Sequence, residues 1–143
     1  MTETGHPAPA RHRVSNGALW FGLFGAPAAW SIQMLADYST DAHGCFPRMY
    51  PLGSPIMGAG RLSLVLWLVS AAAVAIGIAA LVVALRSYAA TRHEWRGESH
   101  ELLDVGEGRT RFMALSGVML SALFLFASLM HAASVLLLAE CSY

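Results

Sequence analysis

Three long runs without a charged residue constrain this chain more than any other feature. They cover residues 19–36, 62–85 and 112–139. Each run has about the ~17–25 residues that a helix needs to cross a ~30 Å hydrocarbon core. Only 13% of the 143 residues are charged, so little polar sequence remains to cover three helices that are apolar on every side. The runs lack the alternation of a membrane barrel, and the chain is predicted to be an all-α integral membrane protein with three transmembrane helices.

The arginines predict the orientation of these helices. Seven arginines precede the first run or lie between the second and third, and two lie on the other side. The seven are Arg11, Arg13, Arg86, Arg92, Arg96, Arg109 and Arg111, and the two are Arg48 and Arg61. Positive charge marks the cytoplasmic side of a membrane protein. We therefore expect a multi-pass protein of the bacterial inner membrane, with a cytoplasmic N-terminus and a periplasmic C-terminus.

The expected organisation follows from these runs. The transmembrane helices are placed at residues 18–38, 62–86 and 112–139. The remaining parts are a cytoplasmic tail (1–17), a periplasmic loop (39–61), a cytoplasmic segment (87–111) and a periplasmic tail (140–143). An extension of the second helix into the cytoplasm is left open by charged residues at i,i+4 spacing after residue 91.

The first run has an alternative interpretation as a cleaved signal peptide. Residues 11–13 are basic and residues 26–28 are small, as such a peptide requires. The apolar run continues past that point as far as Leu35, which favours a membrane anchor.

Two cysteines fall on the predicted periplasmic side, Cys45 in the loop and Cys141 near the C-terminus. An oxidising compartment favours a disulfide between them, which would close a loop of about 95 residues. A metal site is the alternative, because His43, Cys45 and Cys141 together would offer an imidazole and two thiolates to Cu(I) or Zn. Unpaired thiols are the third option.

His131 is the ionisable side chain inside the third run, where a neutral ring needs a hydrogen-bonding partner. Helical spacing places it on one stripe, composed of Gly117, Ser121, Phe124, Ser128, His131 and Val135. A second stripe, on the first helix, is composed of Ala26, Trp30, Gln33 and Asp37. Gln33 and His131 are within axial reach of one another. A structural hydrogen bond between helices is favoured, and a site for protons or a cofactor is the functional alternative.

No motif in the chain indicates catalysis, so an enzyme is not expected. A bis-histidine haem within the bilayer needs two imidazoles, and the three runs contain one. Phosphate-binding glycine loops, paired catalytic carboxylates and zinc-protease motifs are missing from the sequence. A net charge of zero also argues against nucleic-acid binding. No cofactor is expected.

The first third of the chain carries a resemblance. Residues 24–30 (FGAPAAW), then Gln33, Tyr38 and residues 43–47 (HGCFP), resemble a group of small, functionally uncharacterised bacterial inner-membrane proteins. Some of these are similar to companions of haem–copper terminal oxidases of the respiratory chain. The resemblance implies an accessory or assembly role beside such an oxidase.

The leading hypothesis is a non-catalytic accessory subunit or assembly factor of a larger membrane complex, with a respiratory oxidase as first candidate. Its expected partners are other membrane-protein subunits in a hetero-oligomer, together with the lipid bilayer. The alternative is a redox membrane protein that contacts a metal or haem through His131, or through His43, Cys45 and Cys141.

Overall fold

Three long helices make up the part of the chain that the computed structural model describes, residues 14–46, 59–91 and 109–137. α1 spans Asn16–Cys45, α2 spans Ala59–Thr91 and α3 spans Arg109–Leu137. Each helix is long and apolar enough to cross a membrane. The prediction of a helical fold with three candidate membrane spans is therefore confirmed.

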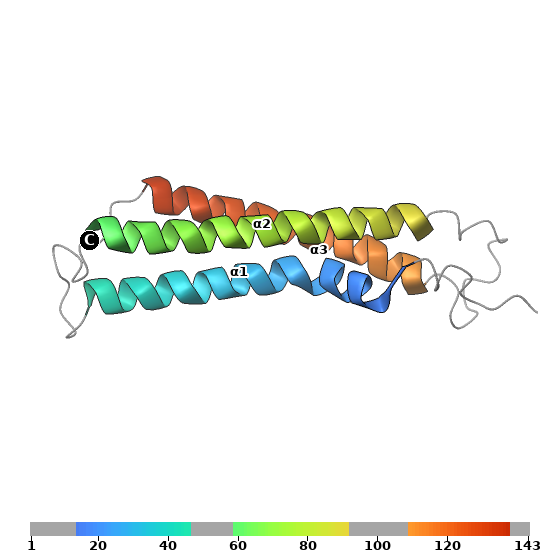
Figure 1. Ribbon diagram of the computed structural model, residues 1–143, viewed down its shortest axis with the longest axis horizontal. Coiled ribbons are helices and arrows are strands. Elements are labelled where there is room, and N and C mark those ends of the chain that lie inside the picture. The colour runs from blue at the N-terminus through green and yellow to red at the C-terminus, as the bar shows by residue number, and fades with distance from the viewer. Residues whose placement is uncertain (1–13, 47–58, 92–108, 138–143) are drawn as a thin grey trace, which may run out of the picture.

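The helices lie side by side as an elongated bundle in which α2 runs opposite to α1 and α3 (Figure 1). Each helix packs against the other two. We call one end of the bundle the Cys45 end, where α1 and α3 finish and α2 begins. The opposite end, where α1 begins at its cap Ser15, is the Ser15 end. The polar side chains described below lie toward the Cys45 end.

α1 is longer than the transmembrane segment predicted at 18–38. It begins after Ser15, whose Oγ accepts a hydrogen bond from the Ala18 N–H at 3.2 Å, as a helix cap does. At the other end it continues to Cys45, because no proline stands between Asp37 and Pro47 to stop it. Residues 39–45, predicted as part of the loop 39–61, are therefore helical.

α2 continues past residue 86 as far as Thr91. The helix thus extends a few residues beyond the predicted span 62–86. The sequence leaves such an extension open. The predicted segment beyond residue 91 lies outside the described residues until α3 begins at residue 109.

Small residues allow the three helices to approach closely. Gly22 of α1 lies at the centre of this packing, because a Cβ there would come within 3.1 Å of the Ala84 Cβ on α2. A Cβ on Gly117 of α3 would lie 3.2 Å from the Gly22 carbonyl carbon and oxygen. Buried alanines extend the same contact along the bundle, namely Ala26, Ala80, Ala84 and Ala114. Membrane helices commonly pack through such small residues.

Large apolar side chains point outward instead. Leu68 of α2 is 62% exposed, and Met119 of α3 is 67% exposed. In water this would be an unstable surface, but in a bilayer the lipid tails cover it. The bundle thus has small and polar residues inside and bulky apolar residues outside, as expected for a protein whose solvent is lipid.

Candidate functional site

Two polar side chains of α1 point into the bundle toward the Cys45 end. Gln33 is fully buried and Asp37 is 5% exposed. They are four residues apart, so they lie on one face of the helix, one turn from each other. Both belong to the predicted stripe of α1, and that stripe faces the other two helices.

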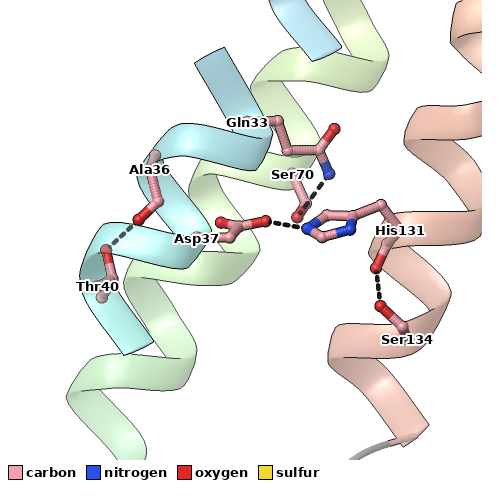
Figure 2. A network of polar contacts seen from close by, with 7 residues as sticks. All are labelled: Gln33, Ala36, Asp37, Thr40, Ser70, His131 and Ser134. Atoms are coloured by element: carbon pink, nitrogen blue, oxygen red, sulfur yellow. Dashed lines mark hydrogen bonds and ion pairs between the residues drawn. The ribbon is translucent and has the colours of Figure 1, made fainter. Parts of the chain in front are cut away.

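His131 of α3 contacts Asp37 (Figure 2). The ring Nε2 lies 2.7 Å from the Asp37 Oδ2, within the range typical of a charge-assisted hydrogen bond. At this distance a proton must lie between the two atoms, because two lone pairs would repel one another. The contact joins the first helix to the third, and it holds one proton whichever partner carries it.

Gln33 makes its contact with α2. Its Nε2 donates a hydrogen bond to the Ser70 Oγ at 3.2 Å, and Ser70 is itself buried. The sequence names Gln33 as the candidate partner of His131, whereas the structure gives that place to Asp37 (Figure 2). The polar cluster, defined as Gln33, Asp37, Ser70 and His131, therefore joins all three helices.

Two acceptor atoms in the polar cluster are not satisfied by the described part of the chain. These are the Gln33 Oε1 and the Asp37 Oδ1, both buried. A buried acceptor that lacks a donor costs about 1–3 kcal/mol. The cluster can therefore accept additional hydrogen bonds at these two atoms.

The two predicted stripes meet along the α1–α3 interface. Trp30 and Phe124 contact each other edge to face, with ring centroids 5.3 Å apart. Farther toward the Ser15 end, the Ser121 Oγ donates to the Gly22 carbonyl oxygen at 2.7 Å. The stripe of α3 predicts that His131 faces the other helices, and these contacts agree with that prediction.

The candidate metal ligands His43 and Cys45 lie in different surroundings. His43 is exposed, and its Nδ1 lies 2.8 Å from the Ser39 carbonyl oxygen of its own helix. Cys45 is buried at the end of α1, and Cys141 lies outside the described residues. Within those residues no group of three His, Cys, Asp or Glu side chains is placed to hold a metal ion. The Cys45–Cys141 disulfide stays a prediction.

Asp37 and Ser70 are the members of the cluster that the sequence interpretation did not assign. Helical spacing places Asp37 on the stripe of Gln33, but the sequence interpretation assigns it no partner. Ser70 lies on a helix that carries no ionisable group between Arg61 and Arg86. The shared helical face was the signal for Asp37, and no comparable signal marks Ser70.

Comparison of the chain with known protein families, curated proteins and solved structures gives no match.

Proposed function

We propose that this protein is a non-catalytic accessory subunit or assembly factor of a larger complex in the bacterial inner membrane, with a respiratory oxidase as the first candidate. The observation that supports the proposal is that the polar groups inside the bundle form hydrogen bonds between its helices. Gln33 of α1 bonds to α2, Asp37 of α1 bonds to α3, and Ser121 of α3 bonds back to the α1 backbone. These groups hold helices together, as in a unit whose role is to pack beside other chains.

The outer surface also fits such a role. Its large apolar side chains suit lipid and partner helices equally, because both are apolar at this depth. The arginine asymmetry supports the orientation, with the Ser15 end on the cytoplasmic side. Labelling of single cysteines introduced at residue 5 and residue 55, in cells and in inverted vesicles, tests that orientation.

Purification from native membranes in a mild detergent tests the accessory role. We expect other membrane chains to co-purify in fixed proportion to the tagged protein. The Asp37→Leu variant, which removes the hydrogen bond between α1 and α3 at His131, should lose them, whereas a change of the exposed Leu68 to Val should retain them. A wild-type protein that stays monomeric, with no partner in fixed proportion, would contradict the proposal.

A second candidate function rests on the proton between His131 and Asp37. A proton-binding element in the membrane needs an acid–base pair between its helices and unused acceptors nearby. The polar cluster has both, with the Asp37 side chain buried and the His131 side chain 25% exposed. Infrared difference spectra across a pH step would test it. We expect a carboxyl band that changes with pH in the wild type and is missing in Asp37→Asn, and a spectrum without such a band would contradict it.

Two measurements distinguish the alternative role, contact with a metal or haem, from the accessory role and from the proton-binding role. Metal analysis and an optical spectrum of the purified protein would detect a bound centre. A stoichiometric metal or a haem band that His131→Ala or Cys45→Ser abolishes would replace the accessory role with the redox role.

A further inference from the structure

A cavity of about 280 Å³ opens at the Ser15 end of the bundle, between the start of α1 and the last turns of α2. Its wall is largely apolar, with Val14, Ala18, Val83 and Ala90 among the lining residues. Pockets for whole small molecules are usually about 300–1,000 Å³. This cavity therefore suits a small headgroup and the first part of an attached apolar chain.

Arg86 also lines the cavity. It is the first charged residue after the uncharged run 62–85, so its guanidinium lies where α2 leaves the apolar part of the bundle. Within the described residues Arg86 has no ion-pair partner, and no carboxylate lines the cavity. A positive charge beside an apolar wall at a membrane boundary favours an anionic ligand with an apolar tail.

The start of α1 adds hydrogen-bond donors on the same side. The Ser15 Oγ, which accepts from Ala18, still has its own O–H to donate. The N–H groups of Asn16 and Gly17 precede the first backbone bond of the helix, from the Leu19 N–H to the Ser15 carbonyl. Gly17 is surrounded by open space, with no heavy atom within 4 Å of its Cβ position. These donors and the helix dipole favour negative charge near Arg86.

We propose that this cavity binds one anionic phospholipid of the cytoplasmic leaflet. Its phosphate lies between Arg86 and the start of α1, and the first part of one acyl chain lies against Ala18 and Val83, on the apolar side of Arg86. Charge complementarity selects an anionic lipid over a zwitterionic one, and the apolar wall selects a lipid over a free phosphate. The inference does not depend on the accessory role, because the cavity is formed within a single chain.

Native mass spectrometry of the full chain in a non-ionic detergent tests this site. Phosphatidylglycerol and phosphatidylcholine of the same chain length are titrated separately, and retained lipid is counted per protein. We expect one phosphatidylglycerol to be retained with higher affinity than phosphatidylcholine. Arg86→Gln should weaken its binding about fivefold, the factor expected for one arginine near a membrane surface. Arg86→Lys should weaken it less, because the charge remains.

Arg61→Gln is the matched control, since it removes one arginine from the opposite end of the same helix. It should leave phosphatidylglycerol binding unchanged. Equal retention of the two lipids, or equal losses in Arg61→Gln and Arg86→Gln, would overturn the proposal. Competition by inorganic phosphate at the same concentration as the lipid would also overturn it, because the site would then be one for free phosphate.

Discussion

The α1–α3 interface is built in two different ways along its length. Around Gly22 and Gly117 the two backbones almost touch, and no side chain separates them. Around Asp37 and His131 the helices are joined by long side chains and one short hydrogen bond. The first region is stabilised by close packing of two backbones, and the second by a hydrogen bond between two polar side chains. We expect an added methyl group to weaken the packing most, and the loss of one partner to weaken the polar contact most.

The largest effect is expected from His131→Ala. Removing the ring leaves the Asp37 carboxylate without its partner inside the bundle. Because the His131 side chain is 25% exposed, the cost is at most about 3–5 kcal/mol, the loss for a fully buried pair. Unfolding in detergent, followed by circular dichroism, measures it. Met130→Ala, a change at an exposed neighbouring position, should have little effect.

The combined change of Asp37→Leu and His131→Leu sharpens the same comparison. It leaves neither charge in the bundle and should be less destabilising than His131→Ala alone. Losses of equal size in His131→Ala and Met130→Ala would show that the Asp37 contact does not hold the helices together.

An intermediate effect is expected from Gly117→Ala. The added Cβ would lie 3.2 Å from the Gly22 backbone, which cannot move aside as a side chain can. Overpacking of this kind costs about 1–3 kcal/mol. Gly17→Ala is the matched control, because open space surrounds that position. Equal stability of the two variants would contradict close backbone packing in this region.

The smallest effect is expected from Gln33→Leu. The change removes a hydrogen bond between membrane helices worth ~0.6 kcal/mol, but it also removes the buried Oε1 that has no donor among the described residues. Ser70→Ala should be more destabilising, because it leaves the Gln33 amide in place without its partner. The unfolding midpoints of the two variants, measured in one detergent, give the order. The reverse order would contradict the Gln33–Ser70 contact.

The helices were predictable from sequence because length and hydrophobicity alone identify a candidate membrane span. The inward faces of α1 and α3 were predictable as well, since stripes such as Gln33 with Asp37 depend only on helical spacing. The pairing across the interface was not. Axial position along two helices leaves an uncertainty of about one turn, and Gln33 and Asp37 differ by one turn. The end of α1 at Cys45 was missed because a helix can continue past the apolar run.

The Asp37–His131 contact has a consequence for biosynthesis. The two residues are 94 positions apart, in the first and last helices. During translation the carboxyl group of α1 is made well before the imidazole of α3. The partner arrives only when α3 has been made, so a chain truncated before α3 leaves Asp37 without the His131 ring. The same hydrogen bond that holds the finished bundle together thus distinguishes a complete chain from an incomplete one.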